Sequence, residues 1–217
     1  MPGPIVGDDG LARCPWAAGH PVNREYHDTE WGRPIQGEAA HLERLTLEAF
    51  QSGLAWITIL RKRPAFRAAF ANFDPEVVAA FDDDDVARLM ADAGIVRNRA
   101  KIESTIANGR ALRDLHASGR TLDQVLWSHA PDRSTHERPA SWADVPAQTP
   151  ESRALAKELK LLGFRFVGRR VHEHADTAHA LLGAGDERRR DGHAAEQRDE
   201  LPPLHTAPWS RDGIVPV

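Results

Sequence analysis

Aromatic side chains that could hold a planar ligand are concentrated near the N-terminus. Three of the six tryptophans, Trp16, Trp31 and Trp56, lie in the first 56 residues, and the single tyrosine, Tyr26, lies among them. Such a cluster can form a pocket in which a nucleobase stacks, although tryptophans also fill helical cores. A pocket needs a polar group as well, and Glu48 precedes Trp56 by eight residues. That spacing is about two helical turns, so both side chains can face one cavity from one helix; the alternative for Glu48 is a solvated carboxylate.

A second candidate site is the basic segment AGIVRNRAK at residues 93–101. We expect Gly94 to end one helix with a positive φ and Asn98 to cap the next, so that the backbone N–H groups between them bind an anion. Five basic residues and one acidic residue occur between positions 94 and 113. They are Arg97, Arg99, Lys101, Arg110, Arg113 and Glu103. A DNA phosphate fits such a locally positive face, and a solvated helix surface is the alternative.

Cys14 and His27 have the side-chain types of zinc ligands. Twelve residues separate them, which is compatible with two of the four ligands of a site whose other ligands come from distant parts of the chain. Because the sequence holds eleven histidines, an unrelated cysteine and histidine are the alternative interpretation.

Length and composition indicate a globular protein with an ordinary core. The 217 residues can bury roughly 70% of the unfolded surface, and a single cysteine excludes an internal disulfide. No apolar run approaches the roughly 18 residues of a spanning helix, and the start MPGPIVGDDG lacks the features of a secretory signal. We therefore expect a cytoplasmic protein without a membrane partner. The net charge of −4 argues against a globally basic nucleic-acid binder but leaves local patches open.

Helical periodicity dominates the first half of the chain. We expect one helix over about 38–60, with Glu48 on its polar side. The apolar arc of that helix consists of Leu42, Leu45, Leu47, Ala49, Phe50 and Leu54. Pro64 is expected to begin a short helix that ends at Phe70.

The following segments are also predicted to be helical. Asp74 is expected to cap a helix that has Pro75 at its first position, and Asp82 to Asp85 open another. A helix-hairpin-helix is predicted at about 84–115, and residues 151–162 form a further helix. No strand-like alternation is convincing, so the predicted fold class is all-α.

The predicted organisation is a single domain with irregular ends. Residues 1–12 are expected to be a flexible leader and residues 13–185 one helical domain. The charge-dense tail at 186–217 has little to bury, so we expect it to be atypical and poorly ordered.

Several segments, taken together and in order, resemble one family. They are RCPW at 13–16, YHDTEWGRP at 26–34, LEAFQSGLAWITIL at 47–60, FDPEVVAAF at 73–81, DAGIVRNRAKI at 92–102 and GFRFVG at 163–168. In these segments the chain is similar to the DNA-3-methyladenine glycosylase I family of the helix-hairpin-helix superfamily. The similarity covers about residues 12–168 and implies an all-α glycosylase fold. It also implies a monofunctional enzyme that flips 3-methyladenine out of double-stranded DNA and hydrolyses its N-glycosidic bond. A monomer is the simpler expectation for an enzyme that scans DNA.

The resemblance also implies roles for individual residues. Glu48 would hydrogen-bond the edge of the excised base and is the predicted catalytic residue. The residues that would stack on, cover or border the base are Tyr26, Trp56, Trp16, Trp31 and His27. The residues that would contact DNA are Ser52, Gly53 and Leu54, with Leu54 as a wedge, and the hairpin residues Gly94, Arg97, Asn98, Arg99 and Lys101.

A structural zinc ion is implied as well, with Cys14 and His27 matching the first pair of ligands. The family takes its second pair from an Asn-Asp-His segment and a following cysteine, and the chain after Gly168 contains neither. The remaining candidates are His172, His174, His179 and His193. Because this metal would join the N- and C-terminal segments, its loss should lower stability more than it alters the chemistry.

Two other functions compete with excision of 3-methyladenine. One is an alkylpurine glycosylase of shifted specificity, since Ala49 and Phe50 beside Glu48 could reshape a pocket. The other is a non-catalytic module that binds DNA lesions. The presence of Glu48, Trp56 and Tyr26 argues against the second.

Overall fold

The computed structural model describes residues 4–131, 146 and 148–167, and that part of the chain is mainly helical. Two short strands, β1 (Ile5–Val6) and β2 (Ala12–Arg13), precede the helices. The helices are α1 (Pro15–Ala18), α2 (Pro21–Thr29), α3 (Glu38–Gln51), α4 (Trp56–Ala69), α5 (Pro75–Ala79), α6 (Asp83–Ala91), α7 (Arg99–Ala117), α8 (Leu122–Ser128) and α9 (Pro150–Leu161), with a 3-10 turn at Ala71–Phe73. The predicted helical fold class is confirmed.

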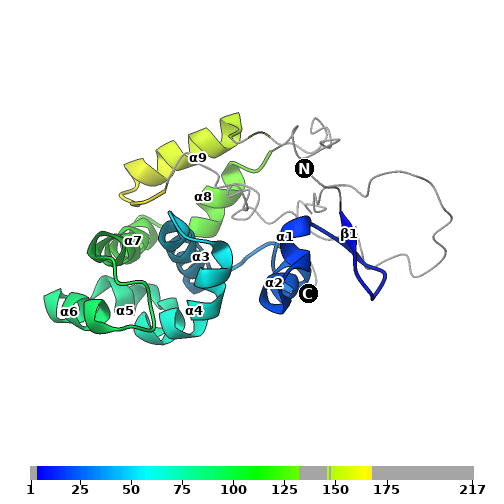
Figure 1. Cartoon of the computed structure of the whole chain (residues 1–217). Coiled ribbons are helices and arrows are strands. Elements are labelled where there is room, and N and C mark those ends of the chain that lie inside the picture. The colour runs from blue at the N-terminus through cyan, green and yellow to red at the C-terminus, as the bar shows by residue number, and fades with distance from the viewer. Residues whose placement is uncertain (1–3, 132–145, 147, 168–217) are drawn as a thin grey trace.

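The helices α3, α4, α5 and α7 enclose the core. The long helix α7 packs against α5 and α3, and α3 packs against α4, while α1 and α2 lie on one side of this group and α8 and α9 on another (Figure 1). Four fully buried phenylalanines follow one another through the centre, with neighbouring ring centroids 4.8 to 6.5 Å apart; they are Phe50, Phe66, Phe70 and Phe73. Burial of each such side chain contributes about 1.5–3 kcal/mol, so this row stabilises the frame that carries the site.

The continuous helix expected over 38–60 is wrong. Helix α3 ends at Gln51 and α4 begins at Trp56. Between them the chain makes a tight turn, in which Gly53 has a φ of +85° and the Leu54 N–H bonds to the Gln51 carbonyl. Glycine adopts this backbone conformation without steric strain. The turn places Leu54 at the surface, 40% exposed, instead of in the apolar arc.

The prediction that Pro64 begins a helix is wrong, because Pro64 lies inside α4. An interior proline removes one backbone hydrogen bond and destabilises a helix by roughly 3 kcal/mol. Ile59 and Phe66, which are both fully buried on this helix, supply apolar burial that offsets this loss.

The helix starts predicted at Asp74, Asp82 and Asn98 are confirmed by their capping bonds. The Asp74 carboxylate accepts from two N–H groups of α5, and Asp82 and Asp85 form a reciprocal capping box at α6. At the start of α7, the Asn98 side chain accepts from the Lys101 N–H. Each such cap contributes about 1 kcal/mol. The predicted pair of helices flanking a tight turn at 84–115 is therefore present as α6 and α7.

The prediction of a positive φ at Gly94 is wrong. Helix α6 ends earlier, at Ala91, and Gly94 is not among the residues with positive φ. Glycine is needed there for space, because a Cβ atom would lie 3.0 Å from the Ala65 Cβ of α4 and 2.9 Å from the Asp92 carboxylate. The turn between α6 and α7 is thus pressed directly against α4.

Part of the predicted leader has regular structure. Ile5 pairs with Arg13 and Val6 with Ala12 in an antiparallel hairpin, so the prediction of a chain without strands is wrong here. Two residues per strand are too few for alternation to be visible in the sequence. Residues 168–185 of the predicted domain and the tail at 186–217 lie outside the described residues, as does most of the segment between α8 and α9.

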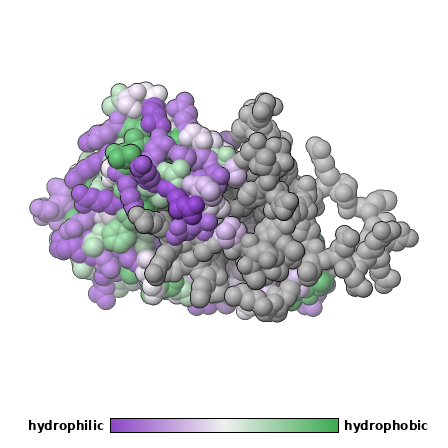
Figure 2. Space-filling view, turned by 90° about the horizontal axis from the view of Figure 1, so that it is seen from above, coloured by the Kyte–Doolittle hydropathy of each residue, from purple (hydrophilic) through white to green (hydrophobic). Residues whose placement is uncertain are grey.

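One face of the described helices is mainly polar. In the view of Figure 2, hydrophilic residues predominate over these helices and hydrophobic ones form only small patches. No helix in the described part of the chain has the length and apolar character needed to span a membrane.

Candidate functional site

Tyr26 and Trp56 form the centre of an aromatic cluster drawn from α1, α2, α4 and the segment that follows α2. Their ring centroids are 5.4 Å apart, with the rings inclined at 62°, and both side chains are buried. Trp16 lies 6.3 Å from Tyr26 and 5.6 Å from Trp31. Trp31 in turn stacks on His27 at 5.3 Å. The structure therefore brings the predicted aromatic residues together, with Trp31 joined to the central pair through Trp16.

Glu48 lies in the last turn of α3 and carries a buried carboxylate oxygen. Its Oε1 atom has no hydrogen-bond partner among the described residues. The indole nitrogens of Trp16 and Trp56 are likewise buried and unpartnered within that part of the chain. A buried polar atom without a partner costs about 1–3 kcal/mol. This acceptor and these two donors are groups that a bound ligand could satisfy.

The alternative of a solvated Glu48 carboxylate is excluded, because its Oε1 atom is buried. The prediction that Glu48 and Trp56 share one helix is wrong, since the turn after Gln51 separates α3 from α4. What joins them is Tyr26, whose ring contacts Trp56 and whose ionisation is sensitive to the charge of Glu48.

Burial changes the acidity of both groups. It raises the pKa of Glu48 to about 7, against the opposing effect of the positive charge of Arg44. It also raises the pKa of Tyr26 to about 12, so that this phenol is neutral at physiological pH. Near neutral pH Glu48 is therefore divided between its two protonation states, and a cationic ligand beside it would favour the carboxylate.

Arg44 holds the hydroxyl group of Tyr26. This arginine is almost fully buried, donates a hydrogen bond from Nη1 to the Tyr26 hydroxyl and lies 3.8 Å from the Glu30 carboxylate. Glu30 also pairs with Arg63 at 2.7 Å, and Arg63 in turn pairs with Glu43. Pairing offsets the cost of taking such charges out of water. The network therefore holds the Tyr26 ring from α3 and α4.

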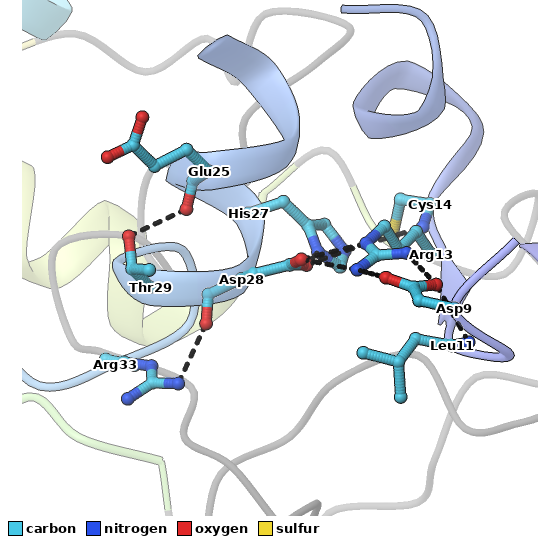
Figure 3. Close-up of polar contacts among 9 residues, drawn as sticks. All are labelled: Asp9, Leu11, Arg13, Cys14, Glu25, His27, Asp28, Thr29 and Arg33. Carbon is cyan, nitrogen blue, oxygen red and sulfur yellow. Dashed lines mark hydrogen bonds and ion pairs between the residues drawn. The ribbon is translucent and has the colours of Figure 1, made fainter. Parts of the chain in front are cut away.

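The predicted metal-ligating residues lie side by side. The Cys14 N–H donates to His27 Nε2 at 3.4 Å, and His27 Nδ1 lies 2.8 Å from the Asp28 carboxylate (Figure 3). Arg13 is buried between Asp28 and Asp9 and bonds to both carboxylates, which fastens the β-hairpin to α2. Within residues 4–131, 146 and 148–167, no three potential ligands come together as a metal site.

The turn at 52–55 presents the residues that were predicted to open the duplex. Ser52, Gly53 and Leu54 are all exposed, and Leu54 is an apolar side chain at the tip. The second predicted DNA contact, the turn at 92–98, exposes Arg97 and Asn98, and Arg99 is exposed just beyond it with an ion pair to Glu103 at 3.3 Å.

The prediction that Lys101 lies on this positive face is wrong. It is only 7% exposed, and its ammonium donates to the carbonyls of Phe50 and Ser52 at 3.0 and 2.7 Å. Burial lowers the pKa of Lys101. Its charge is directed at the end of α3 and not at the solvent, where a phosphate would lie.

Comparison with known proteins gives a consistent result. A family model described as methyladenine glycosylase matches residues 16–176. The chain belongs to the methyladenine glycosylase family.

Characterised members of the family and their solved structures align with most of this glycosylase. It is 40% identical to DNA-3-methyladenine glycosylase 1 of Escherichia coli K12 over 158 residues, which is 73% of this chain and 84% of that protein. A crystal structure of a 3-methyladenine DNA glycosylase I superposes with a TM-score of 0.70 at 38% identity, covering 79% of this chain and 91% of the other. A Staphylococcus aureus enzyme studied for its recognition of 3-methyladenine has a TM-score of 0.65 at 31% identity, with coverage of 79% and 88%.

Two features of this glycosylase escaped the sequence analysis. Arg44 precedes Glu48 by four residues, so one helical turn brings the two charges to the same side of α3. That spacing was a usable signal. Lys62 donates from α4 to the carbonyls of the turn at 92–98, and no sequence pattern predicts this contact because its acceptors are backbone atoms.

Exposed Arg97 and Arg99 should set the salt dependence of DNA binding by this glycosylase. Replacing both with alanine is expected to lower the slope of log K against log salt by about 2, because each phosphate contact releases roughly 0.9 counterion. Titration of labelled duplex at several salt concentrations measures the slope. The control is Arg153→Ala with Lys157→Ala, which removes two exposed charges from α9. An equal loss of slope in both variants would show that the arginines make no particular contact.

Proposed function

We propose that this chain is a monofunctional DNA glycosylase that flips 3-methyladenine out of alkylated duplex DNA and hydrolyses its N-glycosidic bond. The observation that carries the proposal is the buried Oε1 atom of Glu48, which has no partner among the described residues, together with the Tyr26–Trp56 pair, whose tyrosine senses the charge of Glu48. Related enzymes of this family are named for this base, and one has been crystallised in complex with 3-methyladenine.

The arrangement suits a cationic purine. Methylation at N3 gives the nucleotide base a positive charge, so the base is already a good leaving group. The electron-rich faces of Trp56 and Tyr26 favour a cation, and a carboxylate at Glu48 is more effective in a dry site than in water. Neutral adenine lacks the charge and would gain little from either contact. Recognition of charge is thus the basis of selectivity.

Hydrolysis then needs only a water molecule at C1′ of the sugar. As the glycosidic bond breaks, the base leaves with the bonding electron pair and becomes neutral, and the sugar acquires oxocarbenium character. Water adds to C1′ and releases a proton, which yields an abasic site and free 3-methyladenine. In this scheme Glu48 holds the exocyclic edge of the base and stabilises the positive charge of the site during bond cleavage.

The exposed turns would bind the duplex around this pocket. Leu54 would fill the space left by the flipped nucleotide, as apolar wedges do in other proteins that unstack DNA, and Arg97 and Arg99 would contact phosphates. We further propose a cytoplasmic monomer as the working state, since one chain carries all of these groups.

The variant of this proposal with shifted specificity has less support. Phe50 is fully buried against Phe66 in the core, and Ala49 is also buried. Neither side chain is placed where it would reshape a base pocket beside Glu48.

Release of base from methylated duplex tests the function directly. The purified protein is incubated with DNA that contains several alkylated purines, and free bases are separated by chromatography. Release confined mainly to 3-methyladenine supports the proposal, and release of other alkylpurines at similar rates supports the variant of shifted specificity. DNA binding without release would identify a non-catalytic module and refute the proposal.

Zinc is proposed as a structural ion held in part by Cys14 and His27. The donors fit a zinc ion, because a buried thiol and an imidazole lie together and Asp28 orients the imidazole through Nδ1. Zinc would supply no chemistry to the reaction and would tie the N-terminal segment to residues beyond those described.

Removal of this metal should therefore affect stability first. Chelation, or Cys14→Ser, is expected to lower the melting temperature by roughly 5–10 °C while the excision rate of the folded fraction changes little. Elemental analysis should find about one zinc ion per wild-type chain. Metal-free wild-type protein with unchanged melting in chelator would refute the zinc site.

A further inference from the structure

Each DNA-facing turn is held by a lysine from the other half of the site. Lys62 lies on α4, which follows the turn at 52–55, and its Nζ donates to the carbonyls of Ala93 and Gly94 at 3.0 Å and of Ile95 at 3.5 Å. Lys101 lies on α7, which follows the turn at 92–98, and its Nζ donates to carbonyls at the end of α3 and in the turn at 52–55. The two contacts are reciprocal.

The Lys101 contact completes the end of α3. The last carbonyls of a helix lack N–H partners within the helix and carry its negative dipole end. The Phe50 and Ser52 carbonyls are two such groups, and the buried ammonium of Lys101 satisfies both, with its Nζ also 5.9 Å from the Phe50 ring centroid. Glu48 lies in this same last turn. Lys101 of α7 therefore joins the end of α3 to the turn at 52–55.

The Lys62 contact fixes the second turn on α4. Three successive carbonyls converge on its ammonium, which offers three N–H donors. The neighbouring Gly94 packs against Ala65 of α4 with no room for a Cβ atom, and Ile95 is buried in the core. These contacts leave the turn little freedom to move away from α4.

We propose that Lys62 and Lys101 are positioning residues that cross-brace the two turns into one rigid DNA-facing unit. This inference rests on the proposed function. The unit keeps the exposed wedge residue, Leu54, at a fixed separation from the phosphate-binding arginines, so that DNA held at one turn is opened at the other. Because the ammonium groups are bonded to protein carbonyls, their main role is to hold the turns and not to attract phosphate.

Substitution by methionine tests each brace, since methionine retains an unbranched side chain but donates no hydrogen bonds. Lys101→Met is expected to speed amide hydrogen exchange in residues 52–56, and Lys62→Met in residues 93–98, each roughly tenfold. Single-turnover excision should fall roughly tenfold in each variant. Affinity for free 3-methyladenine should stay within about twofold, because the aromatic cluster is intact. Lys157→Met, at an exposed lysine of α9, is the control and should change none of these.

The outcomes separate this inference from the proposed function. Unchanged exchange at both turns, or excision within about twofold of wild type, would overturn the brace while wild-type activity still supports the function. Loss of free-base binding in parallel with excision would also overturn it, because that result indicates general damage. If the wild-type protein released no base, amide hydrogen exchange alone would test whether the two lysines hold the turns, because exchange does not require turnover. If Lys101→Met fails to fold, the less buried Lys62 provides the same test, and Lys62→Arg should restore excision.

Discussion

Glu48→Gln is expected to lower single-turnover excision of 3-methyladenine by roughly 100-fold or more while duplex affinity stays nearly unchanged. The glutamine amide retains the size and one acceptor oxygen of the carboxylate but carries no negative charge. Removal of one well-placed electrostatic group from an active site typically reduces the rate 10²–10³-fold. Duplex affinity should persist because Leu54 and Arg97 are exposed at the surface, whereas the Oε1 atom of Glu48 is buried.

The measurement combines rapid-quench excision with a binding titration on the same DNA. Affinity for the free base should also decrease in Glu48→Gln. The control is Glu25→Gln, at an exposed carboxylate of α2, which should excise at the wild-type rate. Wild-type excision by Glu48→Gln would remove this residue from the catalytic site, and the proposed charge recognition with it.

The same substitution should change how stability depends on pH. Burial raises the pKa of Glu48 to about 7 in the folded protein, from 4.5 for an exposed glutamate side chain. Between these values the native state binds more protons than the unfolded state, so the contribution of Glu48 to the free energy of unfolding falls as pH rises. Glu48→Gln lacks this titration. Its stability relative to wild type should rise by on the order of 3 kcal/mol between about pH 4.5 and pH 8.

Urea unfolding of both proteins at several pH values gives this difference. A constant offset between them is expected as well, because the glutamine amide is itself buried, but that offset does not depend on pH. The difference in unfolding free energy between the two proteins removes the contributions of other titrating groups, such as Asp28. Burial opposes ionisation of Asp28, but hydrogen bonds from Arg13 and His27 outweigh that effect and lower its pKa. A difference that stays flat across this range would show that Glu48 is solvated in the free protein.

These two results together would identify a conflict between stability and function at one position. A buried carboxylate without a partner destabilises the free enzyme, and the same property prepares the site for a cationic base. Arg44 moderates the conflict, since it lies one turn away on α3 and its charge favours the carboxylate. Its guanidinium is occupied by Tyr26 and Glu30 and does not neutralise Glu48 through a direct bond.

The sequence alone was sufficient for the family, the helical class and most helix starts. Asp74, Asp82 and Asn98 could be assigned as caps because capping bonds join residues two or three apart. The aromatic residues of the site could also be named, since the motifs that carry Tyr26 and Trp56 are contiguous. Such features depend on neighbours in the chain, and local spacing contains that information.

Only the tertiary structure decided the environment of each residue. Periodicity placed Glu48 on the polar side of its helix, and the local excess of basic residues placed Lys101 on a phosphate-binding face. In the structure a carboxylate oxygen of Glu48 is buried, and the carbonyls of Phe50 and Ser52 accept hydrogen bonds from Lys101. The break at Gly53 and the close approach of Gly94 to Ala65 likewise depend on contacts between distant segments. Burial and hydrogen bonding to another element's backbone are set by the arrangement of the whole chain, so the pattern along one helix does not determine them.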